Sequence, residues 1–205
     1  MAHSEPVLLP HKDTAHAMKV VESAFAHYAY MEYVAPGEDS RARIVAWFAR
    51  ACVQYGLMFG QVYGMPEKNG VAVWLQPGKT RLTPWRLFRS GFMSIPLNLG
   101  LNGLSRFIRS SWHMEHEHEA YAPGPHWYLF ALAVDPSVQG RGIGGQLLQT
   151  VLPQADRDFL PCYLETHMER NVRFYERHGF KVMSRARMPE STLDIWAMLR
   201  TPQRL

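Results

Sequence analysis

Hydrophobic and polar positions change their period several times along this chain. Residues 13–33 and about 39–55 carry apolar side chains at helical spacing, so both segments are expected to form helices. Short apolar runs at 7–9, 57–63 and 70–75 have the length and the flanking turn residues of strands. The N-terminal part therefore predicts a short strand, two helices and a pair of strands.

The C-terminal half alternates regularly between strand and helix patterns. Residues 127–134 form a continuous apolar run, which is typical of a strand buried on both faces. A glycine-rich loop follows, and the further predicted elements are a helix over about 143–158, a strand at 162–165, a helix at 171–178 that ends at Gly179, and strands starting at Phe180 and spanning 193–199. This alternation predicts the α/β class.

Residues 79–120 have the least regular pattern. They are apolar, contain several arginines and are interrupted by Pro84, Pro96 and three glycines, so we expect two short helices. The uncharged stretch 90–105 is too short, and too broken by Pro96, to span a bilayer. A lid over a pocket is the better interpretation of this insertion.

Composition narrows the class of protein. The chain has 205 residues, with 47% apolar and 20% charged residues, which fits a single globular domain over 1–205. The net charge of +4 comes without a basic run, so no nucleic-acid partner is expected. The first residues lack a basic segment typical of a signal peptide, and we expect a cytoplasmic monomer or homodimer without a membrane partner.

The most informative segment is the loop between the strand 127–134 and the next helix. It contains four glycines, which allow positive φ angles and close approach of a ligand to the backbone. The start of the helix offers unpaired N–H groups to a phosphate, and Arg141 adds a positive charge. The loop therefore predicts a phosphate-bearing ligand.

A dinucleotide is the alternative ligand. Gly140, Gly142 and Gly145 satisfy the G-x-G-x-x-G pattern, and Glu165 follows at the expected spacing, which would suit an NAD(P)-dependent oxidoreductase. However, five residues separate the strand from Gly140, where the dinucleotide fingerprint needs a direct turn. Only 60 residues follow Gly145, too few to complete a doubly wound sheet.

Two motifs carry a resemblance to a known family. Residues 132–136, followed by Gln139-Gly140-Arg141-Gly142-Ile143-Gly144, resemble the acetyl-CoA signature of the GNAT N-acetyltransferases, and residues 164–180 resemble the family's second motif. Together with residues 125–129, they are similar to the puromycin N-acetyltransferase branch. The resemblance spans about 125–182 and implies the GNAT fold, a mixed central sheet with splayed parallel strands flanked by helices.

The resemblance also implies roles for individual residues. Acetyl-CoA would be the co-substrate, without a metal ion, and the residues expected to hold it are Leu132, Ala133, Val134, Gln139, Gly140, Arg141, Gly142, Ile143, Gly144, Gly145, Asn171 and Tyr175. Tyr175 matches the general acid that protonates the departing thiolate, since a phenol is protonated at neutral pH. Glu165 is the first candidate for the base, with Tyr128, Asp135 and His126 as weaker ones.

The expected reaction is transfer of acetyl to a primary amine of a small molecule, and a non-catalytic acyl-CoA sensor is a second alternative. Residues 113–119 alternate histidine and glutamate, but they lack the spacing of a zinc site. A solvated helix end is the simpler interpretation of this run. An intermediate possibility is that one of these groups faces the acceptor pocket, together with Trp74, Trp85, Phe88 and Trp112.

Overall fold

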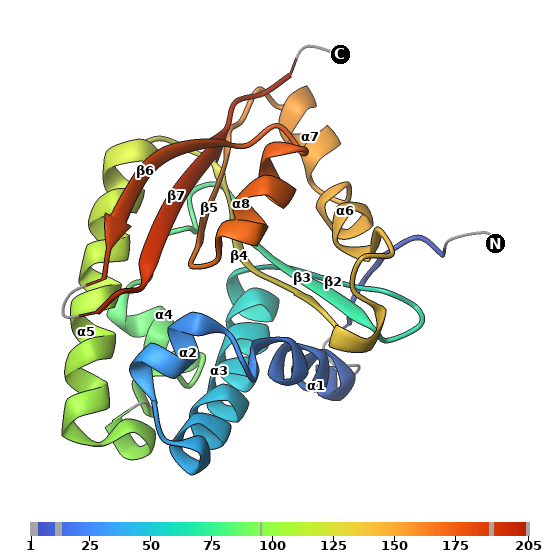
Figure 1. The fold of residues 1–205 in the computed structure, drawn as a ribbon. Helices are drawn as coiled ribbons and strands as arrows, with labels where there is room; N and C mark the ends of the chain where they lie inside the picture. Colours follow the sequence, from blue (N-terminus) through green and yellow to red (C-terminus); the bar gives the residue numbers. More distant parts are fainter. Residues whose placement is uncertain (1–3, 11–13, 95, 189–190, 204–205) are drawn as a thin grey trace.

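The computed structural model describes residues 4–10, 14–94, 96–188 and 191–203. Its centre is a mixed seven-stranded sheet in the order β1-β2-β3-β4-β5-β7-β6 (Figure 1). The strands are β1 (Val7–Leu8), β2 (Gly60–Gly64), β3 (Gly70–Leu75), β4 (Trp127–Val134), β5 (Cys162–Thr166), β6 (Lys181–Arg187) and β7 (Asp194–Arg200). The α/β class and the expected mixed central sheet are thus confirmed.

Helices cover both faces of this sheet. They are α1 (Thr14–Phe25), α2 (Ala29–Val34), α3 (Glu38–Phe59), α4 (Pro84–Arg89), α5 (Pro96–Tyr121), α6 (Ile143–Leu148), α7 (Leu152–Arg157) and α8 (Glu169–Glu176). Helices α1 and α3 lie on one face, while α6, α7 and α8 lie on the other (Figure 1). In the described part of the chain, no helix is both long and apolar enough to cross a membrane.

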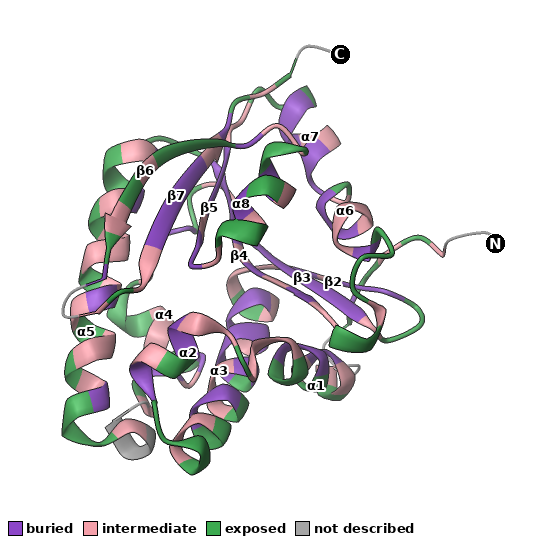
Figure 2. Cartoon of the chain, in the orientation of Figure 1, coloured by how far each residue is buried: buried purple, intermediate pink, exposed green. Residues whose placement is uncertain are grey.

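Each face of the sheet has its own hydrophobic core. Every residue of β3 is buried, because alternate side chains enter the two cores (Figure 2). Cys52 of α3 lies in the first core and Cys162 of β5 in the second, and both thiols are free. Burial raises the pKa of Cys52, and it raises that of Cys162 to about 12.

Strands β4 and β5 are parallel and separate soon after they meet. They pair at Trp127–Cys162 and Tyr128–Tyr163, and β4 then continues to Val134 without further pairing to β5. Phe130 is bulged out of the β3–β4 ladder, because Val73 opposes Ala131 while Trp74 opposes Leu129. The expected splay of the parallel strands is confirmed, and it leaves backbone groups of the inner sheet open to a ligand.

Several predicted boundaries are wrong. The expected helix over 13–33 is two helices, since Tyr28 has an extended backbone and starts α2 as its N-cap. Residues 57–59 extend α3 instead of starting a strand, because Leu57 and Phe59 continue its contact with the core. The expected helix over 143–158 breaks near Val151, where Pro153 has no N–H for a continuing helix.

The insertion at 79–120 also differs from its prediction. It forms the short helix α4, a 3₁₀ turn at Phe92–Ser94 and the 26-residue α5, where two short helices were expected. At Gly100, with φ of 63° and ψ of 177°, the backbone is not helical, so α5 consists of a short first part and a longer helix that are joined at a kink. Helix α5 packs against α2, α3 and strand β7, so tertiary contacts support its length.

Candidate active site

A cavity of about 1430 Å³ lies where β4 and β5 separate. It is bordered by the glycine loop, α8, the ends of α1 and α2, and the insertion that contains α4 and α5. The predicted site residues that line it are Leu132, Val134, Gln139, Gly140, Gly142, Ile143, Gly144, Gly145, Glu165, Asn171 and Tyr175. Ala133 points instead into the core beneath α1, and the side chain of Arg141 is exposed outside the cavity.

The glycine loop has the conformation of an anion-binding turn. Gly140 and Gly142 have φ angles of 79° and 83°, and a Cβ atom at either position would meet open space. Gly142 caps α6, whose first N–H groups have no partner within the helix. Gln139 donates from Nε2 to the Val134 carbonyl over 3.1 Å, which holds the loop against the end of β4.

Asp135 closes the turn before this loop. Its carboxylate accepts hydrogen bonds from the Ser137 N–H at 2.9 Å and the Ser137 hydroxyl at 2.6 Å. Asp135 therefore acts in the structure as the cap of the turn, and it does not line the cavity. This geometry does not support Asp135 as the catalytic base, for which it was a weaker candidate.

Helix α8 adds cavity residues that the motif did not indicate. Arg170 and Arg177 both line the cavity, and they stand seven residues apart, which puts them on one helix face. The seven-residue spacing of the two arginines is the sequence feature that could have indicated them. Asn171 donates from Nδ2 to the Thr166 hydroxyl over 3.2 Å and ties α8 to the end of β5. The arginines add positive charge on the side of the cavity that carries the glycine loop.

Tyr175 is 8% exposed and its ring packs among the core residues behind α8. Burial raises the pKa of its hydroxyl, and the neighbouring Tyr28 raises it further. The phenol therefore stays protonated at neutral pH and can donate a proton. Sequence patterns gave no signal for Tyr28, which reaches the cavity only because the chain breaks between α1 and α2.

Glu165 lies near the end of β5, beyond its last pairing with β4, and lines the cavity. Tyr128 of β4 donates its hydroxyl proton to Glu165 Oε2 over 2.7 Å, across the point where the strands diverge. Burial raises the pKa of Glu165 to about 7, against the lowering effect of the Tyr128 hydrogen bond. A carboxylate with this pKa can accept a proton near neutral pH.

His118 and His126 form a buried pair beside Tyr128. Their Nε2 atoms are 2.7 Å apart, and His126 Nδ1 lies 2.6 Å from the Gly124 carbonyl. Because a carbonyl only accepts, we assign the proton to His126 Nδ1, so His118 Nε2 donates to His126 and both rings are neutral. Burial lowers the pKa of His118 to about 3.

The expectation of a solvated helix end at 113–119 is therefore wrong. His118 is 5% exposed and stacks on Tyr163, while Glu115 lines the cavity. Glu117 accepts a hydrogen bond from Ser184, and Glu119 pairs with Arg81 at 2.8 Å. Among the described residues, no three His, Cys, Asp or Glu side chains are grouped so that they could hold a metal ion.

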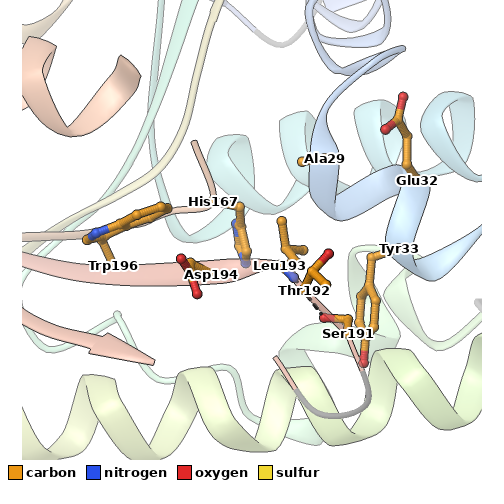
Figure 3. Close-up of a pocket in the computed structure, with 9 residues that line it drawn as sticks. All are labelled: Ala29, Glu32, Tyr33, His167, Ser191, Thr192, Leu193, Asp194 and Trp196. Carbon is orange, nitrogen blue, oxygen red and sulfur yellow. Dashed lines mark hydrogen bonds between the residues drawn. The ribbon is translucent and has the colours of Figure 1, made fainter. Parts of the chain in front are cut away.

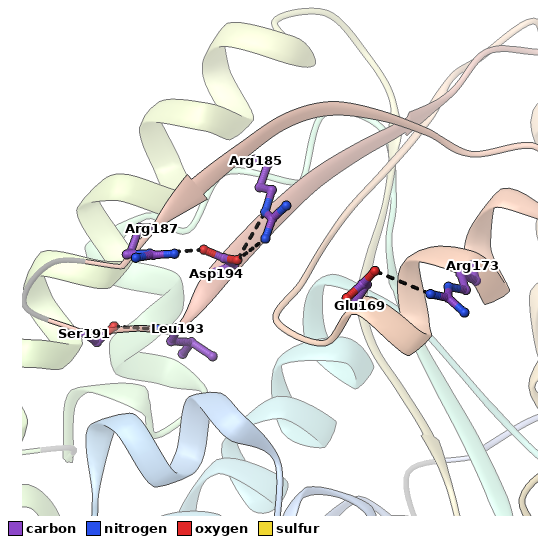
Figure 4. Close-up of polar contacts among 7 residues, drawn as sticks. All are labelled: Glu169, Arg173, Arg185, Arg187, Ser191, Leu193 and Asp194. Atoms are coloured by element: carbon purple, nitrogen blue, oxygen red, sulfur yellow. Dashed lines mark hydrogen bonds and ion pairs between the residues drawn. The ribbon is translucent and has the colours of Figure 1, made fainter.

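A second cavity of about 490 Å³ lies between α2 and the segment that leads into β7 (Figure 3). His167 lines both cavities, and its backbone N–H donates to the Tyr28 hydroxyl over 3.0 Å. Asp194 is the acidic group of this cavity on β7, and Arg185 and Arg187 hold its carboxylate at 2.6 Å and 3.4 Å (Figure 4). The charge of Asp194 is thus already paired within the chain.

Residues 106–182 match the family model described as the acetyltransferase (GNAT) domain. This segment of the chain is thus similar to a GNAT acetyltransferase domain. The sheet agrees with this, because among the described strand pairs only β4–β5 is parallel, whereas a dinucleotide-binding fold needs a mostly parallel sheet. The likeness to the puromycin branch in particular stays a prediction.

Known proteins similar to this chain include an uncharacterized N-acetyltransferase of Schizosaccharomyces pombe, which is 26% identical over 125 residues. The match covers 59% of this chain and 51% of that relative, so the chain spans about half of its length. Among solved structures, a Corynebacterium glutamicum protein titled histone acetyltransferase HPA2 and related acetyltransferase has a TM-score of 0.60 at 22% identity, covering 98% of both chains.

A second solved structure is that of arylalkylamine N-acetyltransferase 2 from Aedes aegypti. It has a TM-score of 0.63 at 11% identity and covers 97% of this chain and 98% of its own. At these identities the two structural likenesses establish the GNAT fold.

Proposed function

We propose that this protein transfers the acetyl group of acetyl-CoA to a primary amine of a small-molecule acceptor. The observation that carries the proposal is the composition of one cavity. It contains the gap between β4 and β5, the glycine loop, a protonated Tyr175 and the carboxylate of Glu165. These are the parts that acyl transfer from a thioester to an amine needs.

The co-substrate would lie along β4 with its phosphates at the loop. Unpaired backbone groups of Leu132 to Val134 would bond the pantetheine arm, and the N–H groups of 139–145 would bond the pyrophosphate. The open space at Gly140 and Gly142 supports this fit, because no Cβ stands between the backbone and a phosphate. Arg141, exposed beside the loop, Arg170 of α8 and Arg177 directly after α8 would add attraction for the anionic groups.

The chemical step is direct attack by a neutral amine. Its nitrogen forms a bond to the thioester carbonyl carbon, and a backbone N–H near Val134 stabilises the oxyanion. The carbon–sulfur bond then breaks and Tyr175 gives its proton to the departing thiolate. Glu165 accepts the proton that the ammonium nitrogen loses, directly or through water, and later transfer of protons with solvent restores both groups.

The similarity to an arylalkylamine N-acetyltransferase fold supports a small amine as the acceptor class. The cavity supports it as well, because it continues past Glu165 toward α4 and α5 and leaves room for a second substrate.

Thiol release from acetyl-CoA tests the proposal on a panel of amines that includes alkylamines, arylalkylamines, polyamines, aminoacyl nucleosides and peptide N-termini. We expect release with at least one amine, and a Tyr175→Phe variant with kcat reduced about 10²-fold or more. Tyr63→Phe is the matched control, since that hydroxyl bonds Gln61 and does not line the cavity.

Two outcomes would overturn the proposal. Acetyl-CoA binding without thiol release on any amine would favour the acyl-CoA sensor. Binding of NADPH in preference to acetyl-CoA would favour the oxidoreductase. An unchanged rate for Tyr175→Phe would remove the general-acid role while leaving the transfer reaction in place.

A further inference from the structure

The large cavity differs sharply in polarity between its two ends. The end at the glycine loop and α8 carries Arg170, Arg177, His178 and backbone N–H groups. The opposite end, formed by α4, the 3₁₀ turn and α5, is lined mainly by apolar side chains such as Phe48, Phe92, Leu104, Phe107 and Ile108. We call this second part the apolar end. Figure 1 shows α4 and α5 on the other side of β4 from α6.

The cavity-lining residues of helix α5 change from apolar to polar along one face. Leu104, Ile108, Ser111, Glu115 and His118 all line the cavity and follow each other three or four residues apart. Of these five residues, Leu104 and Ile108 are apolar, whereas Ser111, Glu115 and His118 are polar. The span from Leu104 to Glu115 corresponds to roughly 16 Å along a helix.

The polar part of this face lies beside the candidate catalytic carboxylate. The rings of His118 and Tyr128 are 4.6 Å apart, and Tyr128 donates to Glu165 over 2.7 Å. An amine that reacts at Glu165 therefore has the apolar residues of α5 on its distal side. Its nitrogen meets Glu165 and Glu115, and the rest of the molecule extends toward Leu104 and Ile108.

The rim of the apolar end is unusual for a surface. Met93, Ile108 and Trp112 line the cavity and are nevertheless 54%, 57% and 73% exposed. Grouped exposed apolar side chains at a cavity mouth are a feature of grooves that bind apolar ligands. The ionised side chains in the same part are few, and Arg81 is already paired with Glu119 at 2.8 Å.

We propose that the acceptor is a primary amine on an uncharged apolar body, alkyl or arylalkyl, which lies in the apolar end with its nitrogen at Glu165. This inference rests on the proposed acetyl transfer and names its substrate class. It disfavours polyamines, because a second ammonium group would be placed among the apolar side chains without a carboxylate partner.

A homologous series of amines tests it. We expect kcat/KM at saturating acetyl-CoA to rise about 4-fold for each methylene from butylamine to hexylamine, close to 15-fold in all, since each buried methylene is worth that factor. Phenylethylamine should react at least as well as hexylamine, and spermidine at least 100-fold less well. A flat series, or a preference for spermidine, would overturn the substrate class while leaving acetyl transfer intact.

A pair of variants assigns the effect to the cavity. Ile108→Ala should lower kcat/KM for hexylamine about 10-fold and for butylamine much less. Leu101→Ala, on the same helix but 86% exposed and outside the cavity, should change neither. Equal behaviour of the two variants would contradict the proposed location.

Binding measured by calorimetry gives a readout without catalysis. With CoA present, hexylamine should bind about 15-fold more tightly than butylamine. If no amine releases thiol but this difference is found, the proposed reaction fails and the apolar amine site stands. If the two amines bind equally, the site itself is refuted.

Discussion

Glu165 shows how one carboxylate acquires a new chemical role from its surroundings. An exposed glutamate has a pKa near 4.3 and is a poor base at neutral pH. At the end of β5, burial raises this pKa to about 7, while the hydrogen bond from Tyr128 keeps part of the charge stabilised. The balance depends on Tyr128 being on the neighbouring strand at the last paired position, Tyr128–Tyr163.

The pH dependence of catalysis should report this group. A base must be deprotonated, so kcat/KM of the wild-type enzyme should rise with pH and reach half of its Glu165-dependent increase near pH 7. Glu165→Gln should lower kcat about 10²–10⁴-fold. The ratio of wild-type to variant rates at each pH cancels the titration of the amine itself. A constant ratio from pH 5.5 to 8.5 would exclude Glu165 as the base.

His118 should make the fold sensitive to acid. Its pKa is about 3 in the folded protein and near 6.5 in an unfolded chain, so between these values only the unfolded state binds the proton. Stability is therefore lost as pH falls below 6.5, and at pH 5 this group alone costs about 2 kcal/mol.

Urea unfolding at pH 7 and pH 5 measures this loss. His118→Gln should make the difference between the two pH values smaller by about 2 kcal/mol. His116→Gln, which removes an exposed imidazole two residues away, should leave the difference as in the wild type. If both variants retain the full difference, His118 is not a source of the acid sensitivity.

At the scale of elements, the glycine loop couples a strand end to a helix start. Gly142 has φ of 83°, which a residue with a side chain adopts at a cost of about 1–2 kcal/mol. Gly142→Ala should therefore lower stability by that amount, and its methyl group should also weaken acetyl-CoA binding about 10-fold or more by occupying the space at the loop.

Gly78→Ala separates the two effects. Gly78 has φ of 77° and equally open space, but it lies outside the cavity. The Gly78→Ala variant should lose a similar amount of stability, measured by thermal unfolding. Its affinity for acetyl-CoA, measured by calorimetry, should not change. Equal affinity loss in the two variants would indicate that backbone strain alone is responsible.

Elements with a strong local pattern could be predicted from the sequence. The apolar run 127–134 and the loop with four glycines occur as expected, since both depend on neighbouring residues. The break at Tyr28 could not be predicted, because apolar positions continue across it and only contacts with Thr166 and His167 explain the turn. The length of α5 likewise depends on packing against α2, α3 and β7.

The residues of the candidate site also divide into those that the sequence could predict and those that it could not. Residues within the two motifs were found, because a loop and a helix following a strand put them near each other. Tyr28 and Glu115 come from segments that meet the motifs only in the folded chain, whereas Arg170 lies inside the second motif and was missed there. His118 was misjudged for the same reason: its partner His126 lies in the turn before β4, on another element.

At the scale of the whole molecule, one buried ion pair fastens the end of the chain to the sheet. Arg200 of β7 makes two hydrogen bonds of 2.7 Å to Asp156 of α7, and the Gln203 N–H donates to the same carboxylate over 2.7 Å. Both side chains are less than 10% exposed. Removal of one partner would leave a buried charge uncompensated.

Asp156→Ala should therefore lower the free energy of unfolding by about 3–5 kcal/mol. Glu169→Ala is the matched control: it breaks the exposed pair of Glu169 with Arg173 in Figure 4 and should cost no more than about 1 kcal/mol. Chemical denaturation measures both. A loss below about 1 kcal/mol for Asp156→Ala would show that the pair does not hold the chain end.

The two cysteines lie on opposite faces of the sheet, and this arrangement makes each thiol a reporter for one face. Only a transient opening can expose Cys52 of α3 or Cys162 of β5, so the labelling rate of each by a thiol reagent measures how often that layer opens. A bound ligand that bridges β4 and α8 would slow labelling of Cys162 more than that of Cys52. The two native cysteines thus report local unfolding of each face without an engineered labelling site.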